Sequence, residues 1–508
     1  MTPVRVRFAP SPTGGLHIGG LRTALYNYLL ARQTGGTMIL RIEDTDQSRF
    51  VPGAEAYIQE ALSWAGIQID EGPEQGGPFG PYRQSERKEI YHRHTQELLE
   101  RGKAYYAFDS ETELEDMRNK LKEEGSHSLQ YDHSIRMKMR NSLTLPAEEV
   151  QKLIREGKYV IRMKVEPGQT IILEDIIRGS VEFDSGQMDD KVLMKSDGMP
   201  TYHLANVVDD HLMKITHVIR GEEWLPSAPL HVMLYEAFGW RETMPRFAHL
   251  PLLLKPDGNG KLSKRDADQL GFPIFPLNWT DPRTNELAKG YREEGYLPEA
   301  LINFLVFLGW NPGTDQEIFS MEQLIKSFSM ERIGKAGARF DIMKAKWFNQ
   351  HYLRAKSTDE LGTLLLDMLK KKQIECSQEK AISIAEAMKD RITFPSELYA
   401  SATFYFSRPI SYDQALVAKK WNELAHKILA DYAQLLTKEV LLTKEKAQEL
   451  LEATCQQHGT KPGAILQLLR ISLTGAGAGP DLMLTMEILG GKESSERIQL
   501  ALQNFSTN

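Results

Sequence analysis

Residues 10–20, PSPTGGLHIGG, decide how the chain begins to fold. Before them, Val4, Val6 and Phe8 alternate with arginines, a pattern that predicts a short strand with one buried face. The prolines and glycines of residues 10–20 cannot continue a strand or a helix, so the chain must turn there. After the turn, apolar residues recur at helical spacing, at Leu21, Ala24, Leu25, Tyr28 and Leu29. The sequence therefore predicts strand, glycine-rich turn and helix, as in an α/β fold.

This turn offers chemistry that suits an anion. The first amide groups of a helix have no partner within the helix, and the helix dipole is positive at that end. Gly19 and Gly20 lack side chains, so a nucleotide can approach closely, and His17 can donate to a phosphate oxygen. The glycine spacing fits neither a dinucleotide-binding fingerprint nor a P-loop. Taken alone, the segment is compatible with a phosphate site and also with a tight structural turn.

A second stretch, KLSKR at residues 261–265, follows the turn-forming residues 256–260, PDGNG. Three cations around a small serine suit a loop that closes over a triphosphate. A basic loop by itself is usually solvated surface. Its pairing with residues 10–20 favours a nucleotide site.

Composition fits a large enzyme. The chain has 508 residues, 41% of them hydrophobic, enough for about three or four domains. It contains no apolar run of about 18 residues, so we expect no membrane span. The chain enters a strand at once without a basic, apolar leader, which predicts a cytoplasmic protein. The two cysteines, Cys376 and Cys455, lie in no metal-ligand pattern, so we expect neither a disulfide scaffold nor a metal site.

The net charge of −7 does not favour an RNA partner, but binding depends on local charge. Between residues 335 and 356 only Asp341 is acidic, and Trp347 and Tyr352 are interleaved. The basic residues there are Lys335, Arg339, Lys344, Lys346, Arg354 and Lys356. This cluster suits either a phosphate backbone and a stacked base or the solvated surface of a helix.

The predicted organisation is an α/β domain that is interrupted and then resumed. Strand-like and helical runs alternate up to residue 105, residues 106–190 are highly charged, and residues 191–269 are again apolar. Further on, the pattern becomes helical: Ser357 and Glu360 are placed as a capping box, and residues 417–436 carry a long apolar stripe that we expect to be core.

Five motifs in order resemble the bacterial glutamyl-tRNA synthetase family of class I aminoacyl-tRNA synthetases. They are RFAPSPTG with HIGG at residues 7–20, RIEDTD at 41–46, YHLAN at 202–206, RGEEW at 220–224 and KLSKR at 261–265. The resemblance covers essentially the whole chain. It implies a Rossmann-like catalytic domain in two halves, 1–105 and 191–269, with an inserted acceptor-binding domain at 106–190. A stem-contact region at 270–340 and an α-helical anticodon-binding region at 341–508 would follow.

The family resemblance also implies the reaction. Glutamate and Mg-ATP would form glutamyl-adenylate and pyrophosphate, and tRNA(Glu) would take the glutamate at its 3′ end with release of AMP. Activation is expected to need tRNA, and no enzyme-bound covalent intermediate is required. The implied catalytic residues are His17, Lys261 and Lys264. A monomer is the expected state.

The substrate residues follow from the same motifs. For glutamate they are Arg7, Ala9, Ser11, Glu43, Tyr202, Asn206 and Arg220. A guanidinium can hold a carboxylate bidentately, which fits Arg7 and Arg220 to the side chain, and Glu43 would hold the α-ammonium group. For ATP they are Pro10, Thr13, His17, Gly19, Gly20, Glu223, Trp224, Lys261 and Lys264.

Two departures from the family pattern stand out: Gly20 replaces the usual second histidine, and residues 270–288 look inserted. In addition, residues 104–109 lack the cysteines that some zinc-binding relatives carry there. The absent cysteines reinforce the expectation of no zinc. For residues 270–288 the sequence suggests no function.

Three alternative functions share some of these features. The glutamine enzyme has an acidic residue in place of Ser11, a histidine in place of Gly20, and C-terminal β-barrels, so all three features disfavour it. A small-molecule adenylyltransferase would lack the helical half. An inactive RNA-binding paralogue is disfavoured by His17, Glu43 and Lys264. Whether tRNA(Gln) is also charged, and which residues read the anticodon, the sequence leaves open.

Overall fold

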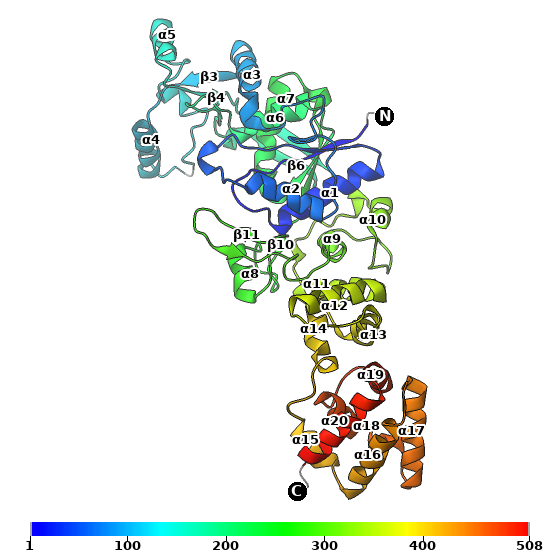
Figure 1. The fold of residues 1–508 in the computed structure, drawn as a ribbon. Coiled ribbons are helices and arrows are strands. Elements are labelled where there is room, and N and C mark those ends of the chain that lie inside the picture. The colour runs from blue at the N-terminus through cyan, green and yellow to red at the C-terminus, as the bar shows by residue number, and fades with distance from the viewer. Residues whose placement is uncertain (1–2, 127, 506–508) are drawn as a thin grey trace. The chain divides into compact units, whose positions relative to one another are not determined.

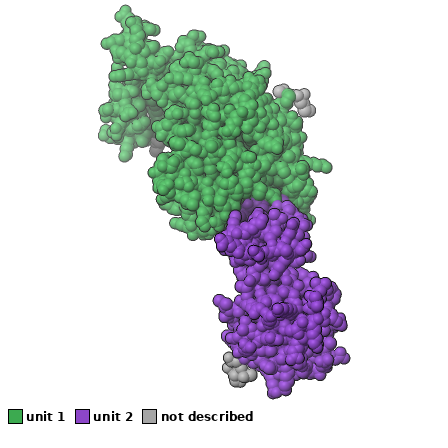
Figure 2. Space-filling model, in the orientation of Figure 1, with its two compact units in different colours: residues 1–294, 298–344 green, residues 295–297, 345–508 purple. Residues whose placement is uncertain are grey.

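The computed structural model describes residues 3–126 and 128–505. The chain divides into two compact units, one of residues 1–294 and 298–344 and one of residues 295–297 and 345–508 (Figure 2). In the described part of the chain, no helix is long and apolar enough to cross a membrane.

The first unit is built on a six-stranded sheet with strand order β2-β1-β8-β9-β5-β6 (Figure 1). Its strands are β1 Arg5–Phe8, β2 Thr37–Leu40, β5 Thr170–Asp175, β6 Gly179–Asp184, β8 His217–Gly221 and β9 Arg246–Leu250. All neighbouring pairs are parallel except β5 with β6, which are antiparallel at one edge. This sheet confirms the α/β prediction.

Strand β1 differs from its prediction in one respect. It was expected to have one buried face, but Arg7 on the other face is only 3% exposed. The reason is that β1 lies in the interior of the sheet, paired with β2 on one side and β8 on the other. Interior strands of a parallel sheet are covered on both faces. A buried arginine there requires a charged partner, which the tertiary structure supplies.

The helices of the α/β part are α1 Ile18–Gln33, α2 Ala54–Trp64, α3 Lys88–Glu100, α6 Tyr202–Leu212 and α7 Ala228–Ala237. Helix α1 packs on β1, β2 and β8, and α7 packs on β5. The residues that predicted α1 by their spacing are all buried, including Leu21, Leu25 and Leu29. The strand, turn and helix unit at the N-terminus is therefore confirmed.

A small second sheet occupies part of the predicted insertion. It has the order β3-β4-β7, with strands β3 Ala104–Ala107, β4 Val160–Met163 and β7 Val192–Met194. Helices α4 Glu111–Glu123 and α5 Ala147–Glu156 lie beside it (Figure 1). Residues 170–184, which the sequence placed in the same insertion, instead form β5 and β6 of the main sheet. Strand β5 pairs with β9, so the inserted segment returns to the core of the first unit.

The rest of the first unit consists of short elements. They are β10 Leu253–Leu254, α8 Lys264–Leu270, β11 Trp279–Thr280, β12 Leu287–Ala288, α9 Pro298–Phe307, α10 Met321–Ser327 and β13 Ala338–Arg339. Helix α9 packs on α1, where the Tyr26 hydroxyl donates to the carbonyl of Val306 at 2.9 Å. Strand β10 pairs with β13, which ties residues near 254 to residues near 338.

The second unit is helical, as predicted. Its helices are α11 Ile342–Ala355, whose first turn belongs to the first unit, and α12 Thr358–Lys371, α13 Gln378–Met388, α14 Glu397–Ala402, α15 Gln414–Lys420, α16 Glu423–Leu436, α17 Lys444–Gln457, α18 Leu466–Thr474, α19 Leu482–Leu489 and α20 Gly491–Asn504. Their buried side chains form two apolar clusters, one over residues 353–405 and one over residues 417–505.

Two predictions for the helical unit have different outcomes. The capping box is confirmed, because the Ser357 side chain accepts from the Glu360 amide while Glu360 bonds back to the Ser357 amide. The prediction of one long apolar stripe over residues 417–436 is wrong in part. The chain breaks between α15 and α16 at Trp421 and Asn422, and Leu424 is 45% exposed. Asn422 caps α16, so its side chain starts a new helix where the spacing suggested a continuous one.

Candidate active site

The first turn of α1 uses its own amide groups. The Ile18 amide donates to the carbonyl of Ile274 at 2.9 Å. The amides of Gly19 and Gly20 donate to Nδ1 of His17 at 3.1 and 3.3 Å. The sequence predicted these amides to be unpaired and ready for phosphate. Instead, they hold the His17 ring as the cap of the helix.

This cap determines which nitrogen of His17 faces outward as a donor. Because Nδ1 accepts two hydrogen bonds, the proton of the neutral ring must reside on Nε2. Partial desolvation of the ring, with the cation of Lys261 second, lowers the pKa of His17. The ring is therefore neutral near pH 7 and presents one N–H group. A Cβ at Gly20 would lie 2.5 Å from Cδ1 of Leu16, so a larger residue here would require the Leu16 side chain to move.

Residues 270–288, for which the sequence suggested no function, brace this turn. A Cβ on Gly15 would lie 2.7 Å from the Trp279 ring, which packs directly over the glycine. Trp279 in turn contacts Tyr57 edge to face, with ring centroids 5.0 Å apart, and the Tyr57 hydroxyl donates to the Leu277 carbonyl at 2.6 Å. Together with the Ile18 to Ile274 hydrogen bond, these contacts fix the position of the turn.

The KLSKR stretch forms a loop and the start of α8. Ser263 caps α8 through a capping box with Asp266, which places Lys264 at the exposed first position of the helix. Nζ of Lys261 lies 2.9 Å from Oε1 of Glu223. Burial disfavours the charged form of Glu223, but the hydrogen bond from Lys261 lowers its pKa. Two residues predicted to bind ATP thus contact each other.

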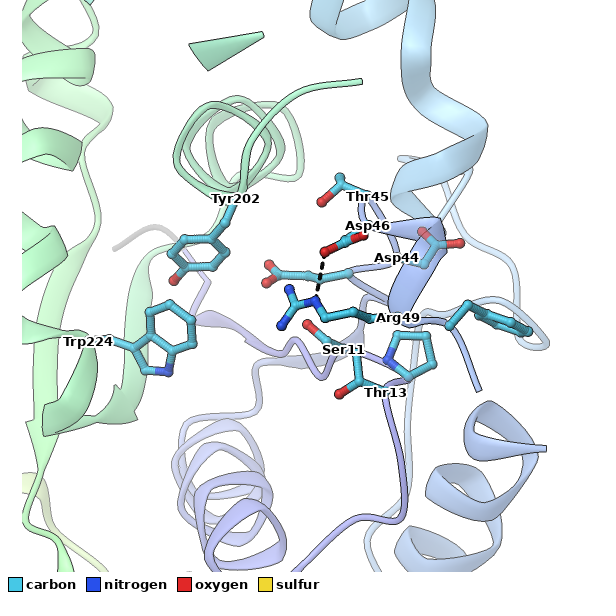
Figure 3. A pocket seen from close by; sticks show the side chains of 11 residues that line it. Ser11, Thr13, Asp44, Thr45, Asp46, Arg49, Tyr202 and Trp224 are labelled. Carbon is cyan, nitrogen blue, oxygen red and sulfur yellow. Dashed lines mark hydrogen bonds and ion pairs between the residues drawn. The ribbon is translucent and has the colours of Figure 1, made fainter. Parts of the chain in front are cut away.

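A pocket opens between the ends of β1 and α6. It is lined by Ser11, Pro12, Thr13, Glu43, Asp44, Thr45, Asp46, Arg49, Phe50, Tyr202 and Trp224. Figure 3 shows the Tyr202 and Trp224 rings together on one side, with centroids 4.4 Å apart, and Ser11 and Thr13 opposite them. At the rim, Arg49 pairs with Asp46 at 2.7 Å. The structure therefore brings the first three motifs and the RGEEW motif to one cavity.

Glu43 is held by its neighbours at this pocket. Oε1 accepts from Nη2 of Arg41 and from Nδ2 of Asn206, each at 3.0 Å. Burial raises the pKa of Glu43, and Arg41 and Arg7 oppose that shift. Its amide donates to the carbonyl of Pro10 at 3.0 Å. This bond joins residues 41–46 to the end of β1, where Ala9 also lies.

Arg7 is bound to a carboxylate. Its Nε donates to Asp210 at 3.0 Å, and Nη1 of Arg41 donates to the same carboxylate at 2.7 Å. In the described part of the chain, the two terminal nitrogens of Arg7 donate to no protein group. They are the only donors on Arg7 left for a ligand, and they have the fork geometry that a carboxylate prefers.

Arg220 has a different set of partners. Its Nε donates to Nε2 of His249 at 3.0 Å, and its Nη1 donates to the Tyr202 hydroxyl at 2.8 Å. His249 in turn bonds through Nδ1 to Asp175 at 2.6 Å. His249, Asp175 and Asp210 were not among the predicted site residues. Each lies in an element that carries other polar residues, so no pattern in the sequence distinguishes them.

The basic cluster of residues 335–356 is largely paired. Lys344 contacts Glu317, Arg354 lies 3.6 Å from Asp390, and Lys356 lies 3.6 Å from Glu360. Three of the six basic residues therefore have acidic partners that come from outside residues 335–356. Phosphate binding here would have to compete with these pairs.

Comparison with known proteins gives the family. Residues 3–347 match the catalytic domain of class I tRNA synthetases (E and Q), and residues 358–502 match an anticodon binding domain. The glutamate–tRNA ligase of Cytophaga hutchinsonii is 56% identical over 99% of this chain and 98% of its own length. That of Porphyromonas gingivalis is 55% identical over 98% of both chains.

Solved structures agree. A glutamate tRNA ligase from Elizabethkingia meningosepticum, in complex with its amino acid, has a TM-score of 0.95 and 49% identity, covering 99% of this chain and all of that one. The glutamate-tRNA synthetase from Elizabethkingia anophelis gives a TM-score of 0.93. The chain belongs to the class I tRNA synthetases, in the family of the glutamate and glutamine enzymes. The predicted fold class is thereby confirmed.

Proposed function

We propose that this chain joins L-glutamate to the 3′ end of tRNA(Glu) through a glutamyl-adenylate, as a glutamate–tRNA ligase. The family uses ATP and an aminoacyl-adenylate, and relatives named for this reaction match nearly the whole chain. The observation that carries the proposal is the pocket at Tyr202, which has Glu43 in its wall. Burial raises the pKa of the Tyr202 hydroxyl, and the positive charges of Arg220 and Arg7 both oppose that rise. Arg7 and Arg220, which lie outside the residues that line the pocket, would supply two cations, and Glu43 in the wall would supply an anion, for an amino acid with a second carboxylate.

In this proposal the glutamate side chain lies between Arg7 and Arg220, and the α-ammonium group lies at Glu43. Asn206 keeps the Glu43 carboxylate in place by its 3.0 Å hydrogen bond. Tyr202 fixes the Arg220 guanidinium from the pocket side. Ala9 and Ser11, at the end of β1, complete the wall. A glutamine side chain would leave a buried guanidinium without its anion, which disfavours it strongly.

ATP would bind beside this pocket as its Mg²⁺ complex. We place Pro10 and Thr13 along the turn, and Glu223 and Trp224 at the nucleoside. Since the Gly19 and Gly20 amides hold His17, their contribution to phosphate binding is made through that ring, which offers its Nε2–H. Lys261 and Lys264 would neutralise charge that develops as the α-carboxylate attacks the α-phosphorus. Lys261 must first leave Glu223, so loop movement accompanies binding.

The remaining regions would bind the tRNA. We propose residues 1–105 and 191–269 as the catalytic domain, 106–190 as the acceptor-binding insertion, 270–340 as the stem-contact region and 341–508 as the anticodon-binding region. Residues 170–184 of this insertion form two strands, β5 and β6, of the catalytic sheet. We further propose a cytoplasmic monomer. The adenylyltransferase alternative does not account for the match of residues 358–502 to an anticodon binding domain.

Exchange of pyrophosphate into ATP tests this proposal. We expect exchange only when glutamate and tRNA are both present, and not with glutamine. Lys264→Ala should lower the activation rate far more than it weakens glutamate binding, while Arg101→Ala, an exposed arginine paired with Glu97, is the control. Exchange without tRNA, or an unchanged rate in Lys264→Ala, would contradict the proposal. Absence of any exchange would favour an inactive paralogue.

A further inference from the structure

The buried guanidinium of Arg220 is surrounded by imidazole rings. Arg220 is 5% exposed and donates from Nε to Nε2 of His249 at 3.0 Å. On its other side, Nη1 lies 3.5 Å from Nδ1 of His231. Within the described residues no carboxylate is hydrogen-bonded to Arg220 directly. The nearest anion along this network, Asp175, is reached only through His249.

Asp175 fixes the His249 ring. Its carboxylate accepts from Nδ1 of His249 at 2.6 Å and from the His249 amide at 3.2 Å. The same carboxylate is anchored by the amides of Ile177 and Arg178 at 2.9 and 2.8 Å. With the Nδ1 proton directed to Asp175, Nε2 of His249 is left as an acceptor that faces Arg220.

The two histidines near Arg220 are neutral. Burial lowers the pKa of His249 although Asp175 opposes the shift, and burial with the cation of Arg220 lowers the pKa of His231. Nε2 of His231 lies 3.3 Å from Nδ1 of His203, so that ring too has a fixed hydrogen-bonding partner. Arg220 is thus oriented by neutral acceptors.

A neutral acceptor and a carboxylate affect an arginine differently. Both orient the guanidinium, but a carboxylate also cancels most of its charge at short range. Arg7, which is bonded to Asp210, is of the second kind. No bonded carboxylate cancels the positive charge of Arg220. This charge therefore attracts a substrate carboxylate in the pocket more strongly than an uncharged carboxamide.

We propose that His249, held by Asp175, is a positioning residue that orients Arg220 without neutralising it and so favours a substrate side chain bearing a carboxylate over a carboxamide. The proposal rests on the binding of glutamate at Arg220 proposed above. His249 touches no substrate. It acts through the 3.0 Å hydrogen bond to Nε of Arg220.

Aminoacylation by the full-length enzyme at saturating ATP and tRNA tests this role. His249→Leu removes the acceptor, and we expect the KM for glutamate to rise roughly 10- to 100-fold, the range for a lost hydrogen bond to a charged group. The KM for ATP should stay within about twofold, and kcat should fall less than the KM rises. His249→Gln, which can accept from Arg220 and donate to Asp175, should restore most of the affinity. His92→Gln, an exposed histidine bonded to the Gly198 carbonyl, is the control.

Competition between glutamate and glutamine provides the second readout. The preference for glutamate should fall in His249→Leu and recover in His249→Gln. A purely structural role would change kcat and both KM values together and would show no change in preference, which would overturn the proposal. If His249→Leu does not fold, the KM for glutamate is measured in Asp175→Asn instead. This substitution keeps the shape of the side chain but removes the charge that fixes the His249 ring. An unchanged KM for glutamate in Asp175→Asn would equally overturn it.

Arg220→Gln separates this inference from the proposed function. If Arg220→Gln raises the KM for glutamate and His249→Leu does not, glutamate binds at Arg220 and His249 is no positioning residue. If Arg220→Gln also leaves that KM unchanged, the proposed glutamate site itself is wrong.

Discussion

Arg7 and Arg220 both act electrostatically on the Tyr202 hydroxyl, but they lie in two different environments. Arg7 lies in a network of carboxylates and guanidinium groups, in which Asp210 is shared with Arg41 and Arg41 also binds Glu43. Arg220 lies among neutral rings and keeps its charge. The partners of a buried arginine thus determine how much of its positive charge is available to a ligand. We call Arg7 with Asp210, Arg41 and Glu43 the Arg7 side, and Arg220 with His249, Asp175 and the neighbouring histidines the Arg220 side. The Arg7 side mainly stabilises the fold around the pocket, and the Arg220 side mainly attracts the substrate.

The largest expected effect is on stability, on the Arg7 side. Asp210→Leu leaves two buried guanidinium groups without their shared anion, and removing one partner of a buried pair costs about 3–5 kcal/mol. Urea denaturation of the full chain should show this loss in the transition of the first unit. His249→Leu, which removes a neutral group, should lose clearly less. Equal losses would mean that the two sides do not differ.

The next effect is on substrate choice, on the Arg220 side. Arg220→Gln should raise the KM for glutamate roughly 10- to 100-fold and reduce the preference over glutamine. Arg7→Gln should reduce that preference less, because Asp210 already compensates the charge of Arg7. Aminoacylation with each amino acid measures both values. A larger loss of preference in Arg7→Gln would reverse the assignment of the two arginines.

The two sides should also respond to acid at different pH. Burial, with Lys191 second, lowers the pKa of His203 to about 4. In the unfolded chain the imidazole is protonated already near its ordinary pKa, so acid favours unfolding. Stability therefore falls from about pH 6.5 towards pH 4. Burial disfavours the charged form of Asp210, but Arg7 and Arg41 outweigh it and lower its pKa. The stability that this carboxylate contributes is present above its ordinary pKa and is lost below about pH 4.

Denaturant titrations at a series of pH values test this separation. His203→Gln should flatten the loss between pH 6.5 and 4, by at most about 1.4 kcal/mol per pH unit. Asp210→Asn should lower stability at every pH above about 4, but it should change the pH dependence of stability only at more acidic pH. A change of the pH dependence in the same range for both variants would contradict it.

The smallest expected effect is at Tyr202. Tyr202→Phe removes one hydrogen bond to Nη1 of Arg220 and keeps the ring packed against Trp224. The KM for glutamate should rise only about three- to tenfold, since the His249 bond still orients the guanidinium. Initial rates against glutamate concentration measure it. A rise as large as that of Arg220→Gln would show that Tyr202, rather than His249, orients Arg220.

Local sequence predicted the start of the fold well. Prolines and glycines end β1, and the spacing of Leu21, Leu25 and Leu29 defines α1, because turn and helix depend on neighbours in the chain. The capping box at Ser357 is local in the same sense. The break at Asn422 was missed although its side chain is a cap, because the apolar spacing on both sides suggested one helix.

Long-range partners could not be predicted in this way. Arg7 and Asp210 are 203 positions apart, and Arg220 and His249 belong to neighbouring strands whose pairing the sequence does not state. Asp175 comes from a segment that its charge placed in the insertion, whereas pairing with β9 brings it into the first unit. Trp279 braces Gly15 in the same non-local way.

The turn at residues 10–20, the motifs around it and the family that they indicate can be predicted from the amino-acid sequence, because they depend on residue type and spacing along the chain. Contacts between distant residues, in contrast, bond Arg7 to a carboxylate and Arg220 to imidazole rings, and the folded turn directs the amides of Gly19 and Gly20 to His17. The physical reason is that the charge and orientation of a buried group depend on which distant groups replace the water it has lost.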